Sequence, residues 1–133
     1  NHSQAEEDIK KILICFGGED PKGFTIPLAN VFAQAFPVAK IVAIMSNENN
    51  QQIEKNVNVV KPILNLKEHL YEYDIVVTHY GLTAFEAIYA GCGVILLPTT
   101  KLHKNLAEKY KIPLIQNENI TSEEIKQFVK SNN

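Results

Sequence analysis

Hydrophobic positions along the chain follow two alternating patterns. Short runs of consecutive apolar residues indicate strands that are buried on both faces. Between them lie longer stretches in which apolar residues recur every three or four positions, as on one face of a helix. The strand-like runs are residues 11–16, 41–45, 57–60, 74–78, 94–97 and 113–115. The helix-like stretches are residues 26–36, 49–55, 66–73, 82–90, 103–110 and 122–129.

This regular alternation of strand and helix predicts an α/β fold. We expect a doubly wound parallel sheet of about six strands, with helices on both faces and right-handed crossovers. Ligands of such sheets bind at the carboxyl ends of the strands. The residues that directly follow each predicted strand are therefore the candidates for a binding site.

Length and composition are those of one globular domain. The 133 residues are enough for one hydrophobic core, and we expect residues 1–10 to be a tail or linker and residues 11–133 to be the domain. The net charge is −2 and the sequence contains no arginine. Arginine is the residue best suited to bind phosphate through two hydrogen bonds and to read guanine. We therefore expect no nucleic acid partner.

Other function classes are disfavoured by what the chain lacks. No apolar run approaches the roughly 18–20 residues that cross a membrane, so we expect no transmembrane segment. Cys15 and Cys92 lie far apart inside apolar runs and are interpreted as reduced core residues of a cytoplasmic protein. The histidines show no metal-ligand spacing. The G-x-G-x-x-G and Walker sequences are both missing, and we expect neither a metal nor another cofactor.

Two segments after predicted strands offer weak signals of binding. Gly17 and Gly18 follow the first strand and let the backbone turn tightly and approach a ligand; the alternative is a turn with no ligand. After the fifth strand, residues 98–105 carry hydroxyl, ammonium, imidazole and amide groups, among them those of His103 and Lys104. Such groups suit hydrogen bonds to a sugar. The alternative is an exposed polar loop.

The segment after the fourth predicted strand carries a stronger signal. Gly81 provides a turn, and the helix expected to begin near Leu82 directs free backbone amides toward the end of the sheet, where they would bind an anion such as a pyrophosphate. Glu86 lies about one turn further along the helix, where a carboxylate accepts hydrogen bonds from ribose hydroxyls. The alternative is a capping box, in which Thr83 and Glu86 serve only the helix terminus.

Read together, these segments resemble the C-terminal domain of two-domain GT-B nucleotide-sugar enzymes. Residues 16–22, Phe-Gly-Gly-Glu-Asp-Pro-Lys, are similar to the F-G-G-[ST]-D-P run of the UDP-sugar hydrolase of pseudaminic acid biosynthesis and related spore-coat polysaccharide biosynthesis proteins. Residues 45–50, Met-Ser-Asn-Glu-Asn-Asn, resemble that family's S-S-N-P-N. Residues 80–86, Tyr-Gly-Leu-Thr-Ala-Phe-Glu, follow Asp74 at the family's spacing and resemble its G-G-S-T-x-x-E. They also look like the L-T-x-x-E of the N-acetylglucosaminyltransferase of peptidoglycan synthesis.

The resemblance implies a Rossmann-like fold of the GT-B C-terminal type and a role for each segment. Amides around Leu82 and Thr83 would hold the diphosphate of a UDP-sugar, and Glu86 would hold its ribose. Backbone groups near Pro62 and Ile63 would pair with uracil. The first-strand loop and the segment that contains His103 and Lys104 would lie near the diphosphate and the sugar.

The implied function is UDP-sugar binding in a glycosyltransferase or nucleotide-sugar hydrolase of bacterial surface polysaccharide biosynthesis. The family's catalytic histidine belongs to an N-terminal Rossmann domain, which we expect in cis or as a partner chain, so no catalytic residue is assigned to this chain. Two alternatives are one subunit of a split glycosyltransferase and a non-catalytic nucleotide-sugar-binding domain. Glu19 and Tyr80 depart from the family pattern and favour the second of these.

Overall fold

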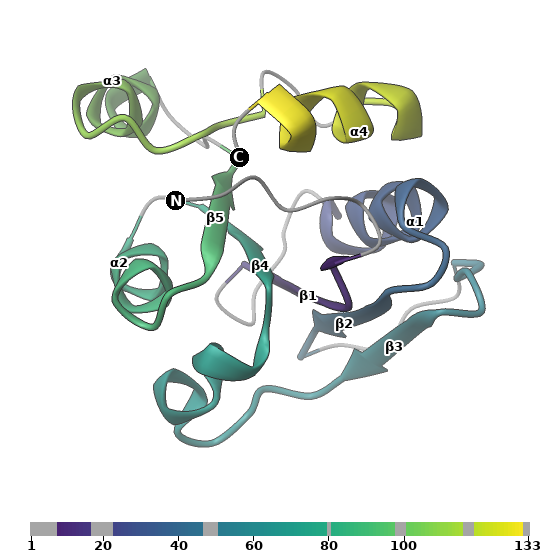
Figure 1. The fold of residues 1–133 in the computed structure, drawn as a ribbon. Coiled ribbons are helices and arrows are strands. Elements are labelled where there is room, and N and C mark those ends of the chain that lie inside the picture. Colours follow the sequence, from purple (N-terminus) through teal and green to yellow (C-terminus); the bar gives the residue numbers. More distant parts are fainter. Residues whose placement is uncertain are drawn as a thin grey trace.

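The computed structural model describes residues 8–16, 23–46, 51–79, 81–97, 101–115 and 119–131. These residues form an α/β fold around a five-stranded, fully parallel sheet with the strand order β3-β2-β1-β4-β5 (Figure 1). The predicted fold class is confirmed. The strands are β1 Lys11–Cys15, β2 Lys40–Ile44, β3 Val57–Val60, β4 Ile75–Thr78 and β5 Gly93–Leu96.

Helices cover both faces of the sheet. On one face lie α1 (Thr25–Ala35) and α4 (Ser122–Ser131), which pack against each other. On the other face lie α2 (Leu82–Tyr89) and α3 (Lys101–Lys109), with two short 3₁₀ turns, η2 (Leu66–Glu68) and η3 (Leu70–Glu72). Figure 1 shows α1 and α2 on opposite sides of the strands. None of the described helices is long and apolar enough to cross a membrane.

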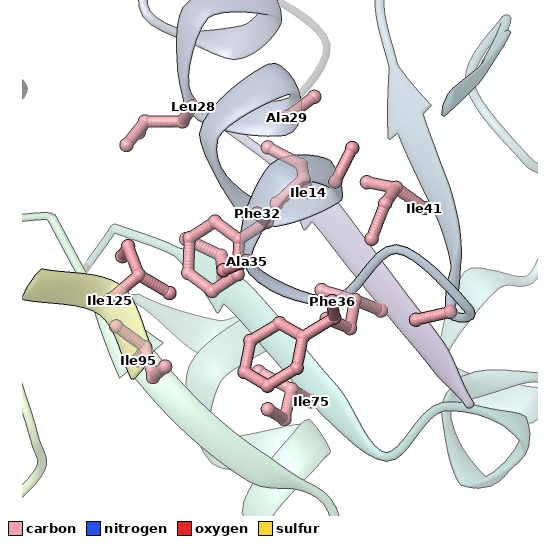
Figure 2. Packing of buried hydrophobic residues seen from close by; sticks show 14 of the residues in the cluster. Ile14, Leu28, Ala29, Phe32, Ala35, Phe36, Ile41, Ile75, Ile95 and Ile125 are labelled. Atoms are coloured by element: carbon pink, nitrogen blue, oxygen red, sulfur yellow. The ribbon is translucent and has the colours of Figure 1, made fainter. Parts of the chain in front are cut away.

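The larger hydrophobic cluster lies between the sheet and α1 and α4 (Figure 2). The rings of Phe32 and Phe36 from α1 and its C-terminal end are fully buried there, beside Ile14 of β1 and Ile75 of β4. Ile125 brings α4 into the same cluster. Complete burial of such side chains stabilises the fold by about 1.5–3 kcal/mol each, so this cluster fixes the positions of the strands.

The start of β1 is held to β4 by one carboxylate. Asp74 Oδ2 accepts hydrogen bonds from the backbone N–H groups of Lys10 and Lys11, at 2.8 Å and 3.0 Å. Ile9, inside the segment expected to be a tail, is fully buried in the larger cluster. Packed residues therefore begin before residue 11, and β1 and β4 start at a common level.

The helix expected over residues 49–55 is not present in its described part, because residues 51–54 have no regular secondary structure and a turn follows at residue 55. A side chain of α1 explains the difference. Asn30 Nδ2 donates to Gln52 O at 2.9 Å, and Asn30 Oδ1 accepts from Glu54 N at 3.0 Å. The side-chain amide of Asn30 therefore holds the backbone of this segment through two long-range hydrogen bonds. These bonds replace those that a helix would have formed.

The helix expected over residues 66–73 is replaced by η2 and η3. Leu70 and Tyr73 are still buried, so the apolar periodicity correctly identified the inward side chains. A segment this short gains little from α-helical propagation. Glu72 instead accepts hydrogen bonds from His69 at 3.1 Å and from Lys11 at 3.3 Å, and these bonds lower the pKa of its carboxyl.

The strand expected over residues 113–115 is reduced to one bridge, between Leu96 and Leu114. Leu96 N donates to Pro113 O at 2.8 Å, and Ile115 N donates to Leu96 O at 2.7 Å. The next bond of a parallel ladder would run from the N–H of residue 113 to the carbonyl of Val94. Proline has no N–H. The ladder therefore does not continue from this bridge toward Val94, and the described sheet has five strands.

Candidate functional site

The strand order places a topological switch point between β1 and β4. β1 pairs with β2 on one side and with β4 on the other, so the connections leave in opposite directions at this point. Ligands of open α/β sheets bind in the crevice outside the strand ends at such a point. The residues that leave β1 and β4 there are Phe16 and His79.

Phe16 and His79 form an aromatic pair at the switch point. Their ring centroids are 6.1 Å apart and the ring planes differ by 27°. The sheet register explains the pair: Ile14 lies opposite Val77, so each ring is two residues further along neighbouring strands. Phe16 is buried and His79 is half-buried. The sequence analysis did not predict this pair, although the shared position after two adjacent strands was a usable signal.

Helix α2 begins directly beside this pair. Gly81 is its N-cap, and no side chain makes a capping hydrogen bond there. The first amides of a helix have no partner within the helix. His79 Nδ1 lies 3.9 Å from the position that a Cβ at residue 81 would occupy. The imidazole therefore borders the start of α2, next to amides that no described side chain caps.

The same four-residue spacing occurs at two helix starts, with different results. At α4, Thr121 and Glu124 form a capping box: Thr121 N donates to Glu124 Oε1 at 2.9 Å, and Glu124 N donates to Thr121 Oγ1 at 3.2 Å. At α2 the N-cap is Gly81, so Thr83 is the second helical residue and Glu86 the fifth. The capping-box alternative for Glu86 is therefore wrong.

Glu86 lacks the partners that would give it a structural role. It is half-buried, and no hydrogen bond or ion pair joins its carboxylate to another residue within the described ranges. Thr83 is half-buried one turn closer to the helix start. Phe85 lies on a different flank of α2, where its ring meets Tyr110 edge to face at a centroid distance of 6.2 Å. Helix α2 also packs against η2 and η3.

Leu82 and the loop after β3 lie largely at the surface. Leu82 is 74% exposed. Pro62 is exposed, and Ile63 is half-buried against the smaller hydrophobic cluster. This loop leads into η2, which α2 contacts. The structure therefore brings η2, which follows this loop, against the helix that carries Glu86.

The remaining predicted site residues are only partly described. Gly17 and Gly18 lie outside the described residues, as does Tyr80. The backbone of His103 is in the first turn of α3, but its side chain lies outside the description, whereas Lys104 is exposed. The described residues contain no group of three or more His, Cys, Asp or Glu side chains placed to hold a metal ion.

Comparison with known proteins identifies the fold. No family model matches the chain. A search of curated proteins finds an uncharacterized protein of Methanocaldococcus jannaschii that is 25% identical over 115 residues. The match covers 78% of this chain and 24% of the M. jannaschii protein. Its name states no activity.

Three solved glycosyltransferases have similar structures. They are the glycotransferase of kitacinnamycin (TM-score 0.69, 19% identity), the glycosyltransferase SnogD from Streptomyces nogalater (0.70, 20%) and the spinosyn forosaminyltransferase SpnP (0.69, 16%). The similarity covers 92%, 92% and 91% of this chain, but 34%, 35% and 34% of those chains. The chain thus spans about a third of their length and has the fold of one Rossmann-like domain of GT-B glycosyltransferases.

Proposed function

We propose that the chain binds the nucleoside diphosphate part of a UDP-sugar, as the C-terminal type of domain in a GT-B glycosyltransferase. The observation that carries the proposal is the combination at α2. Its N-terminus is uncapped by side chains at the switch point, and Glu86, one turn further on, has no described structural partner.

The diphosphate would lie at the start of α2. Backbone N–H groups at a helix N-terminus point toward an anion, and the helix dipole favours negative charge there. The amides of Leu82 and Thr83 would donate to the phosphate oxygens, and the Thr83 hydroxyl would add a further donor. His79 borders the same space and would limit how the diphosphate enters. The absence of arginine from the chain fits this arrangement, since backbone amides supply the donors.

The ribose and base would follow along the flank of α2. Glu86 would accept hydrogen bonds from the two ribose hydroxyls, which are neutral donors that a carboxylate binds well. Backbone groups of Pro62 and Ile63 would then face the uracil. The proposed contacts would follow the order of phosphate, ribose and base, from the start of α2 to the loop after β3.

Transfer of the sugar would need a second domain. GT-B enzymes close two Rossmann-like domains over the substrate, and closure completes the site and excludes water. The three glycosyltransferases of the same fold are about three times as long as the matched part, which supports such a partner, in cis or as a separate chain. They favour transfer to an acceptor over hydrolysis as the reaction. The chain alone would release no UDP from UDP-N-acetyl sugars, and a matching N-terminal domain would restore the release.

Calorimetry with UDP and UMP tests the binding proposal. The second phosphate adds charge and charge-assisted hydrogen bonds at the helix start, so UDP should bind about tenfold or more tightly than UMP. Binding should persist in EDTA, because the described residues offer no metal site. Equal affinity for the two nucleotides, or complete loss of UDP binding in EDTA, would contradict the proposed site.

A further inference from the structure

A cavity of about 350 Å³ lies beside β5, away from the proposed nucleotide site. It is bordered by the starts of β4 and β5, the last turn of α2, the segment after α3, and α4; its lining includes Ile75, Ile88, Val94, Tyr110, Lys111 and Phe128. The volume is within the range of small-molecule sites, about 300–1,000 Å³. Most of the lining residues are apolar. Two polar features are the backbone groups of Val94 and the charge of Lys111.

The first feature is a backbone donor and acceptor at Val94 that pair with none of the described residues across the outer edge of β5. Gly93 N donates to Asp74 O, and Leu97 N donates to Thr78 O, so these residues of β5 face β4. Leu96 faces the outer edge, where its N–H and carbonyl bind Pro113 and Ile115. Alternate residues of a strand face the same edge, so Val94 also faces outward. Pro113 has no N–H to donate to the Val94 carbonyl, and no described carbonyl accepts from the Val94 N–H on this edge.

This edge of Val94 borders the cavity. Val94 is only 6% exposed, and it lines the cavity. Buried backbone groups are nearly always paired with protein or ordered water. The cavity leaves room for a molecule that donates one hydrogen bond to the Val94 carbonyl and accepts one from its N–H.

The second feature is a single cation at the cavity. Lys111 is the one charged residue in the lining, and no ion pair joins it to another described residue. Its backbone has φ 58° and closes α3: Lys111 N donates to Glu108 O at 3.2 Å, and Ile112 N donates to Ala107 O at 2.9 Å. These two bonds form a helix-ending motif that normally uses glycine. They fix the Lys111 backbone beside the cavity, and its exposed side chain carries a positive charge that favours an anionic ligand.

We propose that this cavity binds an N-acylated apolar amino acid with a free α-carboxylate. The amide N–H of the ligand donates to the Val94 carbonyl. One carboxylate oxygen accepts from the Val94 N–H, and the other pairs with the Lys111 ammonium. The apolar side chain lies against Ile75, Ile88 and Phe128. The C-terminal residue of a polypeptide offers the same chemistry as a free N-acyl amino acid.

The test is a titration of ¹⁵N-labelled protein with N-acetyl-leucine, followed by NMR. The Val94 amide should shift in a saturable manner. N-acetyl-leucinamide, which has the same shape but no carboxylate, should bind about tenfold more weakly. Absence of a saturable shift at Val94, or equal binding of the acid and the amide, would overturn the proposal.

Two substitutions at Lys111 separate charge from backbone shape. Asparagine is neutral and tolerates the left-handed conformation, so Lys111→Asn should keep the fold and weaken N-acetyl-leucine binding about tenfold. Lys111→Arg keeps the charge and should bind within about threefold of the natural protein. Melting temperatures check that both variants fold. Unchanged affinity in folded Lys111→Asn would show that the ammonium does not hold the ligand. A leucine-terminated tripeptide that binds more tightly than N-acetyl-leucine would assign the site to a polypeptide C-terminus.

Discussion

The two Thr-x-x-Glu segments allow ligand binding and helix capping to be separated by matched substitutions. Glu124→Ala removes the Thr121 N–H···Oε1 hydrogen bond of the capping box, 2.9 Å long, and should lower the free energy of unfolding by about 0.5–1 kcal/mol. Glu86→Ala removes no described hydrogen bond, so its effect on stability should stay within about 0.5 kcal/mol.

The effects on UDP affinity should be reversed. Hydrogen bonds to a charged group contribute about 1.5–3 kcal/mol, so Glu86→Ala should weaken UDP binding about 10- to 150-fold. Glu124→Ala should leave affinity unchanged, because α4 covers the opposite face of the sheet from α2. Thermal unfolding measures the stability of both variants, and calorimetry measures their UDP affinity. A Glu86→Ala protein that loses stability but retains UDP affinity would refute the assignment of Glu86 to the ribose.

Three further predictions concern the fold. Lys111→Gly relieves the left-handed strain of a non-glycine residue and should raise the free energy of unfolding by about 0.5–1 kcal/mol; a lower value would contradict the helix-ending motif. Asp74→Ala leaves two backbone N–H groups at the start of β1 without their acceptor and should cost about 1–3 kcal/mol in urea unfolding, whereas a neutral result would show that water replaces it. Burial, and to a lesser extent Asp74, raises the pKa of the Cys92 thiol. Cys92 should therefore react with a thiol reagent at pH 8 more slowly in the native protein than in urea, and equal rates would contradict its burial.

The sequence was sufficient for the fold class because most of the buried parallel strands are short runs of consecutive apolar residues. Five of the predicted strands are present within one residue or so of their expected bounds. The sixth is reduced to one described bridge. Pro113 has the apolar character of a strand residue, but it has no N–H to donate to the carbonyl of Val94. The helix expected over residues 49–55 is absent from its described part, where the side chain of Asn30 binds the backbone of Gln52 and Glu54. Local periodicity does not reveal such a long-range partner.

For the candidate site, the sequence predicted a binding role for the start of α2 but could not decide the role of Glu86. Thr83-x-x-Glu86 and Thr121-x-x-Glu124 have the same spacing, and only the position of the N-cap distinguishes them. Gly81 begins α2 two residues before Thr83, whereas Thr121 is itself the N-cap of α4. The Phe16–His79 pair depends on the register between β1 and β4, which is a property of the folded sheet.

The most direct test of the central claim is to map UDP binding onto the backbone amides of the ¹⁵N-labelled protein. If the start of α2 holds the diphosphate, the largest UDP-induced shifts should be at the amides of Leu82, Thr83 and Ala84. UMP should shift these amides less at equal saturation. It lacks the second phosphate, which we expect to accept some of the hydrogen bonds from these amides. Saturable UDP binding that leaves all three amides unshifted would contradict the account.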